Sequence, residues 1–275
     1  MLEIPEAYVM AKQLNETAAG LRIKQVEAAS APHKFSFYYE DPQAYNDLLS
    51  GESIDKASPV GGMVEIRAGD KILLLNDGVN LRFHGPGTTP PQKHQLLIEF
   101  EEGSALSASV QMYGGIFCFR VGTFDNAYYQ VAREKPSPLT DEFDLDYFTG
   151  LISAPEVQKL SVKAFLATEQ RIPGFGNGVL QDIAWKARLH PKRKIQTVTP
   201  AERDDLFVIL KETLQLMAGL GGRDTEKNLY GESGGYGTVM SKLHLNKPCP
   251  VCKGPIVKAA YMGGSVYFCP DCQKD

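Results

Sequence analysis

The sequence predicts an α+β protein in which an N-terminal helix and an antiparallel β-sandwich precede a helical domain and a small cysteine-bearing β-hairpin. Residues 21–131 consist of short β-rich runs broken by Gly, Pro, Asn and Asp, whereas residues 161–217 carry helical apolar spacing. Four of the five cysteines lie in the last 27 residues. We therefore expect three units, at 1–131, 132–240 and 241–275.

The first unit begins with a helix and continues as a sandwich. Pro5 suits a first helical turn, Glu6 favours the positive end of the helix dipole, and Gly20 favours the helix end. The strand-like runs that follow are KILLL (71–75), HQLLIEF (94–100) and SASVQMY (107–113). Turns are expected at 76–78 and 102–103. Short strands at this spacing are typical of an antiparallel sandwich.

The second unit is helical. After a linker at 136–144, the expected helices are 161–170, 178–189 and 199–217. The third of them has the clearest start, because Thr199 and Glu202 have the spacing of a capping box and Pro200 occupies the first helical position. Its apolar stripe is expected to pack in the core. Glycines in 221–237 predict a mobile connection, or a loop that orders on a ligand.

The cysteines form the most specific motif in the chain. Their spacing, Cys-x2-Cys-x16-Cys-x2-Cys, brings Cys249, Cys252, Cys269 and Cys272 together in two tight turns that can present four thiolates to one ion. Such a closed set predicts one structural zinc ion on a β-hairpin. The alternative, two redox pairs, would require a βαβ context that the sequence lacks. Cys118, in a strand-like stretch, is expected to be a buried structural thiol.

Composition and charge restrict the possible functions. The apolar content of 43% and charged content of 23% are globular values, and no apolar run approaches the ~18 residues of a membrane helix. The acidic opening MLEIPEAYVM lacks the basic region of an export signal, so we expect a cytoplasmic protein. Residues 1–150 hold 12 Lys and Arg against 21 Asp and Glu, whereas residues 151–275 hold 17 against 12. Attraction to phosphate, if present, therefore resides in the second half.

A glycine turn between two expected helices offers a second candidate site. Gly174 and Gly176 flank Phe175, and Asn177 precedes the helix that begins near residue 178. Backbone amides at such a helix start can bind phosphate, and an asparagine side chain can add a donor. A purely structural turn is the alternative.

The ordered combination of these motifs resembles the formamidopyrimidine-DNA glycosylase and endonuclease VIII family over essentially the whole chain. The matching segments are LEIPEAYVMAKQL (2–14), DKILLL (70–75), KHQLLIEF (93–100), KPSPLTDEF (135–143), GFGNGVLQDI (174–183), ARLHPKR (187–193) and the cysteine hairpin (248–273). The resemblance implies a bilobal protein with a helix–two-turn–helix and a zinc finger. It also implies binding of duplex DNA as a monomer, extrusion of a damaged base and cleavage of its glycosidic bond.

The resemblance also assigns roles to single residues. It implies that Glu3 transfers protons, that Lys71 lies beside the active site and contacts the lesion phosphate, and that His94 belongs to a DNA-binding strand. It further implies that Gly176 and Asn177 bind phosphate. In the family an N-terminal proline amine attacks through a Schiff base, which suits an α-amine because its pKa near 8 lies below that of lysine.

The sequence departs from this pattern where the chemistry occurs. Leu2 stands at the proline position, and retention of Met1 would place the free amine one residue, about 3.5 Å, out of register. The family's wedge loop reads Phe-His-Gly-Pro-Gly at 83–87, and its intercalating arginine loop reads Gln-Met-Tyr-Gly-Gly at 111–115. Met112 or Tyr113 could act as a substitute wedge or belong to the core. The zinc-hairpin arginine is replaced by Gly264.

Three hypotheses follow. The first is a repair enzyme for damaged or abasic DNA with weakened or lost base excision, in which Met1 or Lys71 supplies the amine. The second is a non-catalytic, zinc-dependent nucleic-acid binding protein on the same scaffold. The third is a scaffold that recognises RNA or a protein.

Overall fold

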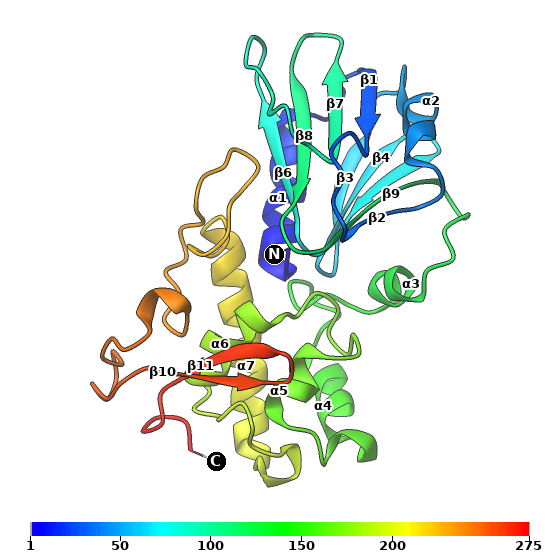
Figure 1. Ribbon diagram of the computed structural model, residues 1–275. Coiled ribbons are helices and arrows are strands. Elements are labelled where there is room, and N and C mark those ends of the chain that lie inside the picture. The colour runs from blue at the N-terminus through cyan, green and yellow to red at the C-terminus, as the bar shows by residue number, and fades with distance from the viewer. Residues whose placement is uncertain (1, 275) are drawn as a thin grey trace.

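The computed structural model describes residues 2–274, which form two lobes stacked along one axis, with helix α1 (Ile4–Thr17) at their junction (Figure 1). Within this range no helix is both long and apolar enough to cross a membrane. The glutamate Glu3 occupies the N-cap position of α1, and Pro5 lies in the first turn as expected. The helix ends at Thr17, and Gly20 follows it with a φ of +84°, a backbone conformation that glycine adopts without strain.

The first lobe is the expected sandwich. One sheet has the strand order β2 (Ser36–Tyr38), β9 (Gly114–Arg120), β5 (Lys71–Leu75), β4 (Met63–Ala68) and β3 (Lys56–Val60). The other has the order β1 (Ile23–Ala28), β7 (Leu96–Phe100), β8 (Ala105–Val110) and β6 (Val79–His84). Neighbouring strands are antiparallel except for β2 and β9, which are parallel. The antiparallel sandwich is thus confirmed, with one short parallel pairing at an edge.

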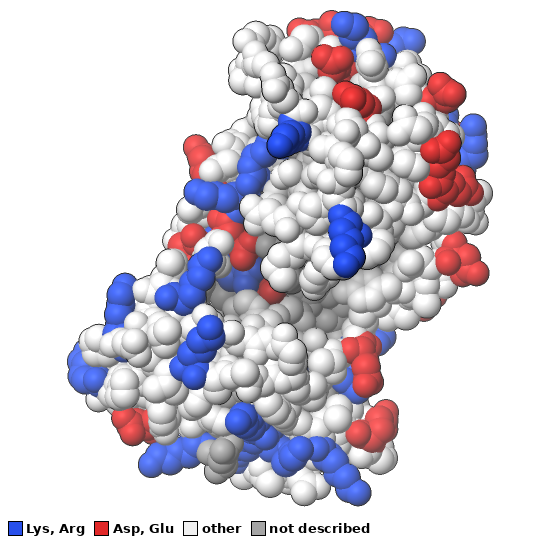
Figure 2. Space-filling view, in the orientation of Figure 1, with Lys and Arg blue, Asp and Glu red and all other residues white. Residues whose placement is uncertain are grey.

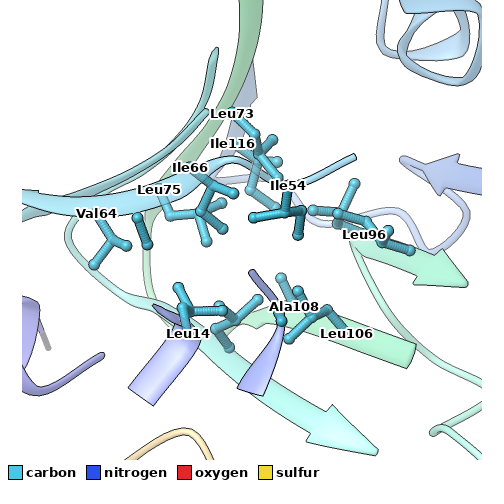
Figure 3. Close-up of a cluster of buried hydrophobic side chains, with 14 of the residues drawn as sticks. Leu14, Ile54, Val64, Ile66, Leu73, Leu75, Leu96, Leu106, Ala108 and Ile116 are labelled. Carbon is cyan, nitrogen blue, oxygen red and sulfur yellow. The ribbon is translucent and has the colours of Figure 1, made fainter. Parts of the chain in front are cut away.

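Alternating apolar side chains from the two sheets and α1 fill the space between them. Figure 3 shows Leu14 of α1 facing Ile66 and Leu75 of one sheet and Leu106 of the other. This burial removes most of the apolar surface of strands β4, β5 and β8 from water, which is the main stabilising contribution to the lobe. Cys118 of β9 belongs to the same core, and burial raises the pKa of its thiol to about 12. It is the buried structural thiol that the sequence predicted.

The second lobe is built from helices. They are α4 (Leu145–Ser153), α5 (Val162–Ala167), α6 (Asn177–Lys186) and α7 (Pro200–Gly219). The short α2 (Tyr45–Leu49) and α3 (Ala127–Glu134) pack against the sheets of the first lobe. Thr199 and Glu202 form the predicted capping box at the start of α7. Helix α5 ends three residues earlier than expected, because Thr168 adopts an extended backbone and Arg171 donates to the carbonyls of Ala164 and Thr168.

The glycine-rich segment 221–237 is packed against both lobes, so the expectation of a mobile connection is wrong. Leu229 is buried in the core of the sandwich, and Tyr236 is buried in the core of the helical lobe. The backbone of Tyr236 also pairs with that of Gly222 and Asp224. Conversely, Ile4 of α1 is buried in the core of the helical lobe. Each lobe therefore contributes an apolar side chain to the other.

The C-terminal hairpin consists of β10 (Val257–Tyr261) and β11 (Gly264–Phe268) and lies across α5 and α6 (Figure 1). The side-chain amide of Gln273, which is buried, donates to the carbonyl of Leu189 at 3.0 Å. Asn177 of α6 donates to the carbonyl of Ser265 at 2.8 Å. The hairpin is thus held on the helical lobe by buried hydrogen bonds as well as by packing.

Candidate active site

A cavity of about 800 Å³ lies at the junction of the lobes, and its wall combines residues from distant parts of the sequence. Figure 2 shows the corresponding hollow between the two lobes, with Lys and Arg side chains gathered mainly on the helical lobe. The polar wall residues that concern the site are Glu3, Asp77, Lys163 and Asn177. A volume of this size is typical of ligand sites in proteins.

Glu3 is buried at the base of this cavity, where its carboxylate faces the start of α6. One oxygen accepts the backbone N–H of Gly178 at 2.9 Å, and the other accepts that of Val179 at 2.8 Å. A Cβ atom at Gly176 would overlap the carboxylate, so glycine is required for this approach. The backbone amides at the start of α6, which the sequence suggested as a phosphate-binding site, therefore donate to Glu3.

Arg223, from the glycine-rich segment, completes a buried ion network with Glu3 and Glu6. Its guanidinium lies 3.1 Å from Glu3 and 2.7 Å from Glu6, and only 2% of the arginine side chain is exposed. Burial raises the pKa of Glu3, while Arg223 and the two α6 amides oppose that shift. The network fixes the orientation of Glu3 and joins α1, α6 and the glycine-rich segment.

Lys163 and Asn177 line the cavity beside the tip of the C-terminal hairpin. The Lys163 ammonium donates to the carbonyl of Tyr261 at 2.8 Å. A Cβ atom built on Gly264 would lie 3.4 Å from the Lys163 nitrogen and 3.8 Å from the Asn177 amide nitrogen. The side chains of Lys163 and Asn177 therefore approach the same point of the hairpin, Gly264, which has no side chain. Burial lowers the pKa of Lys163.

The rim of the cavity is apolar and aromatic. Met112 is 65% exposed and Tyr113 is 41% exposed, so both project from the β8–β9 connection instead of entering the core. Of the two roles that the sequence left open for them, exposure favours the wedge. Tyr128 and Met262 lie on the same rim. Asp77, in the β5–β6 turn, is half-buried beside it, and this partial burial raises the pKa of its carboxyl group.

The structure does not bring Lys71 and His94 to this cavity. Lys71 begins β5, whereas Asp77 follows the other end of that strand, about 13 Å away along the strand. Its ammonium lies 2.5 Å from Glu52 and 2.8 Å from Asp70, and these hydrogen bonds raise its pKa. His94 is buried near β1, with its ring nitrogens close to Pro91 and Glu27.

The N-terminal residue that could act as an amine, Met1, lies outside the described residues. Leu2 is described, and its backbone nitrogen is an amide that donates to the carbonyl of Asp77 at 2.8 Å. Position 2 therefore offers no free amine. Lys163, Asp77 and Arg223 were missed by the sequence analysis, because neither spacing nor periodicity distinguishes them from other charged residues.

Four cysteines form the other candidate centre. The sulfur atoms of Cys249, Cys252, Cys269 and Cys272 lie within 4.8 Å of one another and could hold one metal ion. Two of their separations are 3.8 Å and 3.2 Å, near the roughly 3.8 Å expected between thiolates of a tetrahedral zinc site. The N–H of Gly254 points to the Cys252 sulfur at 3.4 Å, a contact that stabilises thiolate character. The donor set and its spacing fit zinc.

Comparison with known proteins gives a consistent assignment. No family model matches the chain. The chain is 28% identical to the formamidopyrimidine-DNA glycosylase of Symbiobacterium thermophilum, over 99% of this chain and 89% of that protein. It is 29% identical to the protein of the same name from Mycoplasmopsis pulmonis, over 100% and 98%.

Solved structures show the same fold. The Lactococcus lactis Fpg, determined in complex with DNA containing an abasic site, matches with a TM-score of 0.83 at 22% identity, over 99% of this chain and 100% of that one. MutM (Fpg) from Thermus thermophilus matches with a TM-score of 0.81 at 24% identity, over 98% of both chains. The full-length relatives, this fold and the cysteine cluster agree with one another and support the formamidopyrimidine-DNA glycosylase and endonuclease VIII family for this chain.

Proposed function

We propose that this protein is a DNA-repair protein of the glycosylase and abasic-site lyase type, which binds damaged or abasic duplex DNA between its lobes. The observation that carries the proposal is the interlobe cavity, which combines two carboxyl groups, an amine and an exposed apolar rim. Carboxyl groups transfer protons, an amine can form a Schiff base, and apolar side chains can replace an extruded base in the stack. The names of the matched relatives support the same reaction class.

The distribution of charge supports the mode of binding. The helical lobe and hairpin carry an excess of basic residues, whereas the sandwich is acidic. We expect phosphate contacts mainly from residues 151–275, with Asn177 and Gly176 beside the extruded nucleotide. Such contacts position the duplex without reading its sequence.

Zinc, bound by the four cysteines, would have a structural role. A closed set of four thiolates leaves no open position for a reactant, so the ion would hold the hairpin in place. The tip of that hairpin, at Met262 to Gly264, forms one wall of the cavity, and the adjoining Tyr261 carbonyl contacts Lys163. Zinc would therefore act on function through the placement of this wall.

The reaction is expected to favour abasic sites over intact lesions. Excision of a base requires a nucleophile at the glycosidic carbon, and Leu2 offers only an amide nitrogen that is already hydrogen-bonded. Glu3 can take part in proton transfer, but both its oxygens are held by α6 and Arg223. An abasic site needs no base expulsion and is open to any well-placed amine. Proton transfer alone contributes about 10²–10⁴ in rate and does not replace a missing nucleophile.

Single-turnover cleavage of two matched duplexes tests this proposal. One duplex carries 8-oxoguanine and the other an abasic site at the same position. We expect binding of both and strand cleavage mainly of the abasic duplex. Rapid excision of intact 8-oxoguanine would contradict the expected preference. Binding with no cleavage of either duplex would instead favour the non-catalytic binding protein, for which the engagement of both Glu3 oxygens by the α6 amides is the supporting observation.

A further inference from the structure

We propose that Lys163 supplies the amine that forms the covalent intermediate with the abasic deoxyribose. This inference deepens the proposed function and rests on it. It differs from the two amines that the sequence suggested, Met1 and Lys71. Three features of the described residues carry it: the position of Lys163 in the cavity, its lack of a carboxylate partner, and the open space beside it.

Position is the first feature. Among residues 2–274, Lys163 is the lysine in the wall of the interlobe cavity, and no arginine shares that wall. It lies on α5, whose start is fixed by the Ser161 side chain accepting the N–H of Ala164. The hairpin carbonyl of Tyr261 holds its ammonium group at 2.8 Å. The amine is thus oriented by two rigid elements, as a nucleophile requires.

The electrostatic environment is the second feature. A lysine attacks only in its neutral form, so a lowered pKa increases the reactive fraction near neutral pH. Burial lowers the pKa of Lys163, and within the described part of the chain no carboxylate opposes that shift. Lys71 has the opposite environment, because Asp70 and Glu52 hydrogen-bond its ammonium and raise its pKa.

Space beside the amine is the third feature. The position on the hairpin tip nearest to the Lys163 nitrogen is Gly264, where a Cβ atom would lie 3.4 Å away. Asn177 approaches the same point, and its side-chain oxygen is buried without a hydrogen-bond partner within the described structure. The Asn177 amide nitrogen donates to the carbonyl of Ser265, so the side-chain oxygen is the atom left to accept a hydroxyl hydrogen of a bound sugar intermediate. The glycine thus keeps the hairpin tip free of a side chain beside Lys163, which itself lines the cavity of about 800 Å³ in which we place the deoxyribose.

The reaction balances without an added oxidant or reductant. The Lys163 nitrogen attacks the aldehyde carbon C1′ of the ring-opened sugar, and the resulting carbinolamine loses water to give an iminium ion. A carboxylate of the cavity wall, Asp77 or Glu3, removes a proton from C2′. The C3′–O bond then breaks, and its electron pair leaves with the 3′ phosphate. Water hydrolyses the conjugated iminium, which releases the unsaturated aldehyde and restores the amine.

Borohydride reduction traps this iminium and identifies the amine directly. The full-length, zinc-containing protein would be incubated with an abasic duplex and borohydride, and the cross-linked peptide mapped by mass spectrometry. We expect the adduct on Lys163. The Lys163→Arg variant, which keeps a charged donor but cannot form a Schiff base, should lose trapping by on the order of 100-fold or more. Lys163→Met should behave in the same way.

Two lysines provide matched controls. Lys186→Arg alters another partly buried lysine whose pKa burial lowers, but which bonds Thr213 instead of facing the cavity. Lys71→Arg tests the amine suggested by the sequence. Both variants should give the same yield of borohydride-reduced cross-link to the abasic duplex as the unaltered protein. Binding to a duplex with tetrahydrofuran, an abasic analogue without an aldehyde, should be unchanged within about twofold in Lys163→Arg, which would separate loss of chemistry from loss of binding.

An adduct on the N-terminal residue or on Lys71, with normal trapping by Lys163→Arg, would overturn the inference and leave the proposed lyase function intact. Absence of any adduct and any cleavage in the unaltered protein would reject the lyase function and the inference together. The two failures are therefore distinguishable in one set of experiments.

Discussion

Replacing Arg223 with methionine tests the ion network that joins the lobes beneath the cavity. Arg223 bonds Glu6 through two guanidinium nitrogens, at 2.9 Å and 2.7 Å, and lies 3.1 Å from Glu3. Methionine fills a similar apolar volume but leaves both carboxylates without their cation. All three side chains are at least 94% buried, so water cannot replace the lost partner without rearrangement.

The expected loss of stability follows from that burial. Removing one member of a buried ion network costs about 3–5 kcal/mol, because a charge is left without compensation in a region of low polarity. The hydrogen bonds of Glu3 to Gly178 and Val179 remain, which favours the lower part of this range. The variant with Glu3→Gln, Glu6→Gln and Arg223→Met carries no buried charge at these sites, and should recover most of the loss.

The loss should depend on pH in a defined direction. Burial already raises the folded-state pKa of Glu3 above 4.5, and removal of Arg223 should raise it further. A carboxyl group with a raised folded pKa contributes stability below its unfolded pKa, and that stability is lost as the pH rises through the folded pKa. The difference between the two proteins should therefore be larger at pH 7 than at pH 4.

Urea unfolding, monitored by the fluorescence of Trp185, provides the measurement. Trp185 is the single tryptophan of the chain. Trp185 lies on α6, the helix whose start is capped by Glu3. A decrease of less than about 1 kcal/mol in the free energy of unfolding at pH 7 would contradict this expectation, because exposed ion pairs contribute amounts of that size. A loss that is equal at pH 4 and pH 7 would also contradict it.

Three further predictions concern separate parts of the molecule. The purified protein should contain one zinc per chain, and Cys252→Ser should reduce both zinc content and DNA affinity; a metal content well below one by elemental analysis would reject the zinc site. Tyr113→Ala should weaken binding to an abasic duplex more than to an intact one, and equal weakening of both in a titration would argue against a wedge. Hydrogen bonds from Arg193, followed by those of the capping box, lower the pKa of Glu202 to about 2. Glu202→Gln should therefore cost about 1 kcal/mol at pH 7, with a cost that shrinks as the pH falls from 4.5 toward 2; a constant cost in acid denaturation would contradict this.

Local patterns in the sequence were enough to determine much of the fold. The capping box at Thr199 and Glu202 was readable because a helix start depends on residues three positions apart. The strands and turns of the sandwich could be predicted because the alternation of side chains and the turn residues are patterns of only a few consecutive positions. The four cysteines were readable because metal-ligand spacing is itself local within each pair.

The composition of the cavity was decided by tertiary structure alone. Lys71 and His94 lie in segments that match the family, yet the sheet directs them to the other end of β5 and to the edge near β1. Lys163 of α5 and Asp77 of the β5–β6 turn line the cavity together with Glu3, and Arg223 of the glycine-rich segment contacts Glu3. These three segments are distant in the sequence, and only tertiary packing brings them together. Residue type and spacing identify which groups are able to react. Their pKa values and their mutual positions depend on burial and on contacts across the lobes, which no local pattern encodes.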